Sequence, residues 1–224
     1  FDFKKDPKRF KWYLRPIAGI MVAPAWRKYK PVVHYNRGVE NLKAPYLLLC
    51  NHNAFLDFKI AYRLLKGVKP SFVVAIDGYI GREGLMRNVG CICKRKFTKS
   101  PLLVRKLKKV LDRGDVPVVY PEARYSLCGT TSVLPESLGK MIKLFKVPVA
   151  TLICHGHHVN SPFWDTSHER GVDHVEADYT LLFTPEEIDS LSVDEINARL
   201  VEAFSYDDFL WQRQNNIRIT DKKR

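Results

Sequence analysis

A histidine and a carboxylate, His52 and Asp57, lie five positions apart just after a short apolar run. That run, residues 46–50, is typical of a buried strand, and the apolar spacing over residues 54–66 predicts a helix. Inside a helix, five residues turn through about 500°, which would point the two side chains about 140° apart. We therefore expect His52 to precede the helix, so that its imidazole can fold back onto Asp57.

Such a pair can act as a general base. A carboxylate at one imidazole nitrogen fixes the tautomer of the ring and leaves the other nitrogen to accept a proton. No serine nucleophile lies nearby in the sequence, so we expect the proton to come from a substrate hydroxyl. Asn51 and Asn53 are good capping residues that would start the helix after His52. In the alternative interpretation, His52 is only a structural histidine of this turn.

Two groups of charged residues are candidates for binding an anionic substrate. A short strand over residues 90–93 runs into three consecutive cations: Lys94, Arg95 and Lys96. Such a cluster suits phosphate, although a solvated charge run on a loop is the alternative. The apolar run 116–120 delivers Glu122 and Arg124 at its carboxyl end, where open α/β sheets bind their ligands.

The cysteines and the remaining histidines suggest fewer roles. Residues 154–158 read Cys-His-Gly-His-His and contain zinc-type ligands, but adjacent ligands rarely suit one tetrahedral site. We favour a structural or site-facing turn there and expect no metal and no other cofactor. A rival mechanism makes Cys50 a nucleophile with His52 as its base, which requires the strand to continue through the turn. Five cysteines without a Cys-x-x-Cys pair favour a reducing cytoplasm over a disulfide framework.

The order of the elements predicts the fold. Strands are expected at residues 32–35, 46–50, 71–76, 90–93, 116–120, 147–153 and 175–183. Helices are expected at residues 54–66, 102–111 and 134–146, after a cap at Thr184, and from a cap at Ser192 towards Trp211. This alternation predicts an α/β domain over residues 31–224, with a mostly parallel mixed sheet flanked by helices.

Residues 1–30 precede that domain and mix basic, aromatic and apolar residues. This composition predicts a basic amphipathic helical segment lying on an anionic membrane surface, or else a helix packed on the core of the domain. A start at Phe1 is typical of a piece of a longer protein. No apolar run approaches the roughly 20 residues that span a bilayer, and no signal peptide is evident.

A net charge of +13 over 224 residues implies anionic partners, which include nucleic acid, phosphorylated metabolites and acidic membranes. The chain has no recognisable nucleic-acid-binding motif, so we expect no nucleic-acid partner. A non-catalytic basic module that binds nucleic acid or a membrane is the alternative from outside the enzymes.

Several of these segments together resemble the glycerolipid acyltransferase family, which includes the 1-acylglycerol-3-phosphate (lysophosphatidic acid) acyltransferases. The resemblance covers roughly residues 32–152. Its Asn-His-x4-Asp motif matches Asn51, His52 and Asp57, and residues 38–42 match the usual lead-in. Residues 90–96, 120–126 and 147–150 are similar to the family's second, third and fourth motifs.

The resemblance implies acyl transfer from acyl-CoA or acyl-carrier protein to a lysophospholipid. The acceptor would most simply be 1-acylglycerol-3-phosphate, with glycerol-3-phosphate as another candidate. His52 and Asp57 would be catalytic, with no covalent enzyme intermediate. The residues implied to bind substrate are Asn51, Gly90, Arg95, Lys96, Glu122 and Arg124. The family's third-motif arginine falls at Tyr125, and its second-motif arginine falls at Lys96. A peripheral protein at the cytoplasmic face of the membrane is expected.

Overall fold

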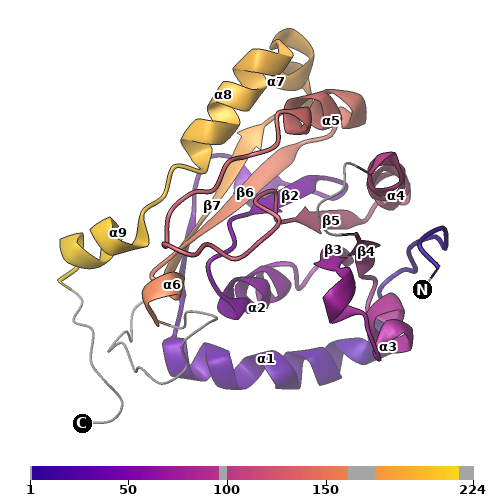
Figure 1. The fold of residues 1–224 in the computed structure, drawn as a ribbon, viewed down its shortest axis with the longest axis horizontal. Helices are drawn as coiled ribbons and strands as arrows, with labels where there is room; N and C mark the ends of the chain where they lie inside the picture. Colours follow the sequence, from indigo (N-terminus) through magenta and orange to yellow (C-terminus); the bar gives the residue numbers. More distant parts are fainter. Residues whose placement is uncertain (1, 96–99, 161–174, 217–224) are drawn as a thin grey trace.

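A computed structural model of the protein describes residues 2–95, 100–160 and 175–216. It is an α/β fold whose seven-stranded sheet has helices on both faces (Figure 1). The strands are β1 (Val32–Tyr35), β2 (Leu47–Cys50), β3 (Pro70–Ala75), β4 (Ile92–Lys94), β5 (Val116–Val119), β6 (Val149–His155) and β7 (Glu176–Phe183). Their order in the sheet is β1-β7-β6-β2-β5-β3-β4, and each neighbouring pair is parallel except antiparallel β6 and β7. The predicted fold class is confirmed.

The helices form two layers around this sheet. They are α1 (Arg15–Tyr29), α2 (Phe55–Leu64), α3 (Glu83–Asn88), α4 (Pro101–Asp112), α5 (Ser137–Phe145), α6 (His157–Asn160), α7 (Pro185–Ser190), α8 (Val193–Ala203) and α9 (Asp208–Gln214). Short 3-10 turns occur at η1 (Trp12–Leu14), η2 (Val39–Asn41) and η3 (Ile76–Gly78). Figure 1 shows α1 and α2 on one face and α4, α5 and α8 on the other.

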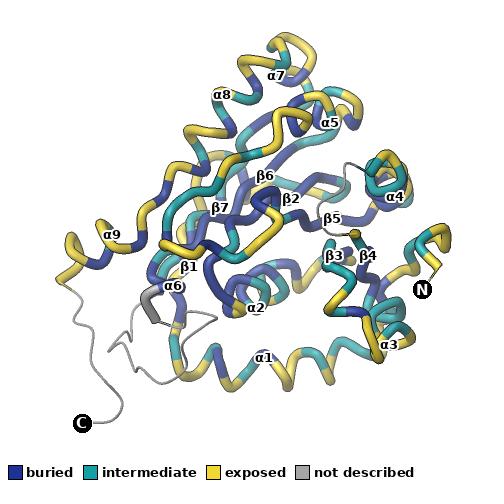
Figure 2. The backbone as a smooth tube through the Cα atoms, in the orientation of Figure 1, coloured by how far each residue is buried: buried dark blue, intermediate teal, exposed yellow. Residues whose placement is uncertain are grey.

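The central strand β2 supplies side chains to both cores. Leu48 and Cys50 pack with residues of α1 and α2, whereas Leu47 and Leu49 pack with residues of α4, α5 and α8. All four are fully buried, and Figure 2 shows the interior strands in the colour of buried residues. A strand covered on both faces is apolar throughout, which explains the short continuous run in the sequence.

Capping residues set several helix ends. Thr184 and Ser192 each accept the backbone N–H of the glutamate three residues on and so begin α7 and α8, as the sequence predicts. The prediction of one continuous last helix is wrong. Asp207 accepts the backbone N–H groups of Phe209 and Leu210, both at 2.9 Å, and thereby starts a separate helix α9.

Helix α1 differs from the predicted amphipathic helix. Its Val22 and Ala25 are buried, yet Ile17, Ile20 and Met21 on its outer side are 57%, 72% and 72% exposed. Apolar side chains therefore occupy both faces, and amphipathy is not confirmed. Within the described ranges, no helix combines the length and the apolar character that crossing a bilayer requires.

The topology brings three strand ends together. Strand β2 lies between β5 and β6 and is parallel to both, so the segments that follow all three strands emerge at one edge of the sheet. Those segments begin near Asn51, Tyr120 and Gly156. The candidate site lies at this edge.

Candidate active site

His52 lies in the turn between β2 and α2, and Asp57 lies in the first turn of that helix. Their side chains face each other, with 3.6 Å between His52 Nδ1 and Asp57 Oδ2. The predicted placement of His52 before the helix is therefore confirmed. Asp57 Oδ2 also accepts the backbone N–H groups of Asn53 at 2.6 Å and Ala54 at 2.9 Å, which fixes the carboxylate against the helix start.

The expected capping by asparagine is wrong, because the residue at the helix start is Ala54. The two asparagine side chains instead tie this turn to the rest of the molecule. The Asn51 amide exchanges two hydrogen bonds with the backbone of Cys154, at 2.8 and 2.9 Å. The Asn53 amide donates to Asp208 at 3.2 Å. Asn51 is fully buried, and its role in substrate binding stays a prediction.

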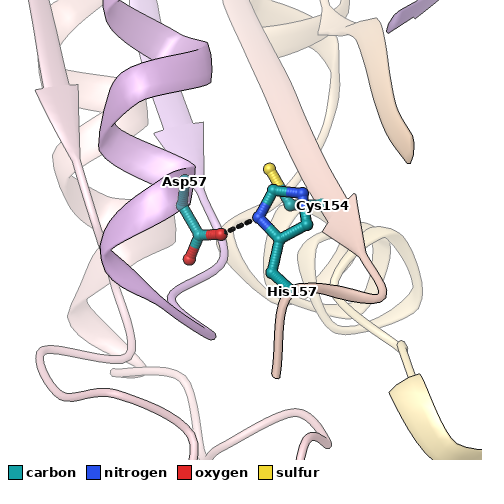
Figure 3. A group of neighbouring side chains, drawn as sticks. All are labelled: Asp57, Cys154 and His157. Carbon is teal, nitrogen blue, oxygen red and sulfur yellow. Dashed lines mark hydrogen bonds and ion pairs between the residues drawn. The ribbon is translucent and has the colours of Figure 1, made fainter. Parts of the chain in front are cut away.

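A second histidine that sequence reasoning did not place also binds Asp57. His157, at the start of α6, donates from Nδ1 to Asp57 Oδ1, and both side chains are completely buried (Figure 3). Burial alone would favour the neutral acid. His157 foremost, and then His52, outweigh that effect and lower the pKa of Asp57 to about 2. Asp57 is therefore an ionised carboxylate between two imidazoles.

The same cluster is the group of described residues best placed to hold a metal. Ligand atoms of Asp57, Cys154 and His157 lie within 4.8 Å of one another. However, Asp57 and His157 are in direct hydrogen-bond contact, whereas two ligands of one tetrahedral zinc ion would stand about 3.3 Å apart. Burial also keeps the pKa of the Cys154 thiol well above its usual value, which opposes thiolate ligation. This geometry favours a hydrogen-bonded pair.

Two aromatic rings hold the imidazole of His52 in place. Its ring centroid is 4.2 Å from that of Tyr120 and 4.0 Å from that of Tyr125. Tyr125 stands where the resemblance places an arginine, so a ring packed on His52 replaces a cation there. The His52 side chain is 18% exposed while its Nδ1 is buried facing Asp57. Nε2 is therefore the nitrogen that can meet a substrate.

Glu122 lies close to His52 but faces inward. Its carboxylate accepts the backbone N–H of His52 at 3.2 Å, the backbone N–H of Ser132 at 2.9 Å and the hydroxyl of Tyr206 at 3.0 Å. Burial raises its pKa. The structure thus shows Glu122 organising the loops behind His52, and its predicted contact with substrate remains a prediction.

The predicted phosphate-binding cations are spread along the sheet edge. Arg124 follows β5, next to the strand of His52, and is exposed without a hydrogen bond or ion pair inside the described ranges. Arg95 follows β4, three strand spacings or about 14 Å from β2, and lies over the ring of Phe3 at 4.3 Å. Lys96 lies outside the described residues.

Gly90 has a packing role. Its φ is +76°, and an added Cβ would approach the backbone of Phe10 to 3.1 Å and that of Pro70 to 3.2 Å. The N-terminal segment passes so close to this position that only glycine fits without strain. Its assignment to substrate binding stays a prediction.

The rival cysteine mechanism meets an obstacle in the burial of Cys50. The side chain is completely buried, and this burial raises the pKa of the thiol well above its usual value. A thiol that is hard to ionise and has no exposed surface is a poor nucleophile. The geometry therefore favours His52 as a base acting on substrate.

Comparison with known proteins agrees with this arrangement. A family model described as Acyltransferase matches residues 32–155, more than half of the chain. The chain belongs to this acyltransferase family. The match contains His52, Asp57 and Glu122, together with the strands that carry them.

A solved structure shows the same fold. The 1-acyl-sn-glycerophosphate (LPA) acyltransferase PlsC from Thermotoga maritima aligns with a TM-score of 0.62 over 85% of this chain and 79% of its own, at 17% identity. No curated protein sequence matches significantly. The acyltransferase family assignment therefore rests on the family match, with the structural likeness supporting the fold.

Proposed function

We propose that this acyltransferase moves a fatty acyl group from acyl-CoA or acyl-carrier protein to the free hydroxyl of a lysophospholipid. The favoured acceptor is 1-acylglycerol-3-phosphate, which would give phosphatidic acid. The observation that carries the proposal is the geometry of His52, whose buried Nδ1 faces the ionised Asp57 while Nε2 is available to substrate. Family membership and the fold shared with PlsC support the choice of substrates.

In the proposed reaction, His52 Nε2 takes the proton of the acceptor hydroxyl. The oxygen attacks the thioester carbonyl, the tetrahedral intermediate collapses, and the carbon–sulfur bond breaks. The departing thiolate takes the proton back from His52, so the products are an ester and a thiol. Asp57 stabilises the imidazolium that forms in between, and the tyrosine rings keep the imidazole from turning away.

For the phosphate of the acceptor, Arg124 is the best-placed described cation. It follows β5, the immediate neighbour of β2, and its guanidinium has no competing hydrogen bond or ion pair in the described ranges. An arginine can bind a phosphate through two parallel N–H donors. We propose that Arg124 is the main phosphate contact and that Arg95, farther along the edge, contributes less.

The exposed side of α1 supports an association with an anionic membrane. Ile17, Ile20 and Met21 form an apolar stripe, and the exposed Arg27 and Lys28 lie at the end of the helix. Apolar side chains can enter the headgroup region while cations bind anionic lipids. We propose peripheral binding through this surface, at the cytoplasmic face of the membrane.

Vesicle sedimentation tests the membrane proposal. An Ile20→Asp/Met21→Asp chain should lose several-fold in binding to phosphatidylglycerol vesicles at low salt. The matched control carries Leu144→Asp/Val201→Asp, because these two residues are similarly exposed but belong to α5 and α8 in the opposite layer. Equal losses in both variants would contradict an α1-specific surface.

An acceptor panel tests the proposed reaction. The chain is incubated with palmitoyl-CoA and one of three acceptors: lysophosphatidic acid, glycerol-3-phosphate or lysophosphatidylcholine. Mass spectrometry should detect phosphatidic acid as the main product, with thiol release in equal amount. A dominant product from either other acceptor would reassign the substrate, and thiol release without any ester would indicate a thioesterase.

A further inference from the structure

We propose that His157 is a positioning residue of the reaction, which holds Asp57 in the orientation and charge state that His52 needs. This inference rests on the proposed function. His157 is separated from Asp57 by 100 residues and lies outside the family match, which ends at residue 155.

The contacts of Asp57 carry the argument. Its two oxygens have separate tasks: Oδ2 faces His52 and accepts two backbone N–H groups, while Oδ1 binds His157 Nδ1. Of the two imidazoles, His157 is the closer, because His52 Nδ1 stands 3.6 Å from the carboxylate. His157 therefore fixes the rotation of the carboxyl group and directs Oδ2 towards His52.

Apart from the two backbone N–H groups at Oδ2, the surrounding residues give Asp57 little other help in staying ionised. The other titratable groups that interact with it are thiols and phenols, which offer no positive charge: Cys50, Tyr120, Tyr125, Cys154 and Tyr206. A carboxyl buried among such groups is driven towards its neutral form. The two imidazoles favour the ionised form. Because His157 and Asp57 are both fully buried, solvent water cannot take over the contact between them.

Helix α6 is itself held firmly, which suits a positioning role. Asp208 accepts the backbone N–H of His158 at 3.0 Å and the side-chain amide of Asn53 at 3.2 Å, and its own backbone N–H donates to Gly129 at 2.8 Å. One residue of α9 thus ties together the segments that follow β2, β5 and β6. A Cβ at Gly129 would lie 2.7 Å from the ring of His158, so these segments are also closely packed.

Two substitutions of similar size separate positioning from packing. In His157→Asn, the side-chain amide nitrogen can take the place of Nδ1 and still donate to Asp57. In His157→Gln, the amide falls near the position of Nε2, and the donor facing Asp57 is lost. The control is His155→Gln, because His155 pairs with Asp178 at 3.2 Å and not with Asp57.

The pH profile of kcat/KM should distinguish the variants. We expect His157→Asn to stay within about tenfold of the wild type. His157→Gln should lose at least 100-fold at pH 6 and recover much of it at pH 9, because Asp57 without its donor ionises only at higher pH. A uniform loss at every pH, or equal losses in the Asn and Gln variants, would overturn the proposal. His155→Gln should keep the wild-type profile.

A carboxyl titration makes the test independent of activity. With 13C-labelled aspartate, and with Asp57→Asn to assign the signal, Asp57 should be ionised at pH 5 in the wild type and partly protonated in His157→Gln. If the wild-type chain shows no acyl transfer, the proposed function fails, and this titration still decides the inference. A protonated Asp57 in the wild type at pH 5 would refute it even if His157→Gln does not fold.

Discussion

Two buried carboxylates near opposite ends of the central strands have different partners. Asp115 lies just before β5, where Arg9 binds both its oxygens at 3.0 and 3.1 Å and Arg113 binds it as well. Asp57 lies at the other end, just after β2, between two histidines. A guanidinium keeps its proton at any pH a protein meets, whereas an imidazole can accept and release one near neutrality.

The difference indicates separate roles for two similar side chains. Arg9, which binds Asp115, belongs to the N-terminal segment, and Arg113 donates to the backbone of Pro7 at 2.8 Å. This cluster therefore attaches residues 7–9 to the domain. The Asp57 cluster instead leaves one imidazole nitrogen open to substrate. The first cluster holds the N-terminal segment to the fold, and the second one is the proposed catalytic cluster.

Among the carboxylates, the largest expected effect is that of Asp57→Asn. A neutral amide cannot stabilise the imidazolium of His52, so kcat should fall on the order of 10³-fold. Thiol release from palmitoyl-CoA measures this, and circular dichroism checks the fold. If Asp57→Asn retains a tenth of the wild-type rate, Asp57 is no more catalytic than Asp115.

Asp115→Asn should give the opposite result, a loss of stability without a loss of chemistry. Removing one partner from a buried ion pair costs about 3–5 kcal/mol, and about 2 kcal/mol is expected here because the Arg9 side chain is half exposed and can be hydrated. Urea unfolding measures the change. The rate per folded molecule should stay within twofold of the wild type. A much lower rate would show that the Asp115 cluster also affects the reaction.

A third buried carboxylate, Asp208, sharpens the comparison because its hydrogen-bond donors, the Asn53 amide and the backbone N–H of His158, are uncharged. Burial raises its pKa to about 6, against roughly 3.9 in an unfolded chain. A raised carboxyl pKa gives stability that is present below pH 4 and is lost as the pH rises through 6. Between pH 4 and 7 the wild type should therefore lose about 2 kcal/mol relative to Asp208→Asn. Parallel pH curves of unfolding free energy would contradict this.

The two arginine substitutions should have the smallest effects, and Arg124→Ala the larger of the two. An exposed guanidinium bound to a phosphate contributes about 1–2 kcal/mol, so the KM for lysophosphatidic acid should rise about tenfold with kcat nearly unchanged. Arg95→Ala is the matched comparison, and its smaller expected effect follows from its greater distance along the sheet. A change confined to kcat would contradict the proposed role of Arg124 in phosphate binding.

The local part of the site could be predicted from the sequence. His52 and Asp57 are close in the chain, and an apolar run followed by helical spacing defines the turn between them. All seven strands were predicted to within two residues, because buried strands are short, apolar and bounded by turns. Helix α3 was missed, because its six residues include Gly84 and are too few to show apolar periodicity.

The parts that depend on spatial neighbours could not be predicted. His157 reaches Asp57 only because β6 lies next to β2, and strand order is not encoded in local patterns. For the same reason, the histidines at residues 155, 157 and 158 looked like one cluster, yet they contact three different aspartates, His158 through its backbone N–H. The inward orientation of Glu122 could not be predicted either. Its donors Ser132 and Tyr206 lie 10 and 84 residues further along the chain.

The central claim is that His52 is the base for acyl transfer, and one measurement tests it directly. Thiol release from palmitoyl-CoA is followed with and without lysophosphatidic acid, in the wild type and in a folded His52→Ala chain. We predict acceptor-dependent release in the wild type and a loss of at least 10³-fold in His52→Ala. Acceptor-dependent release at an undiminished rate in His52→Ala would contradict the account.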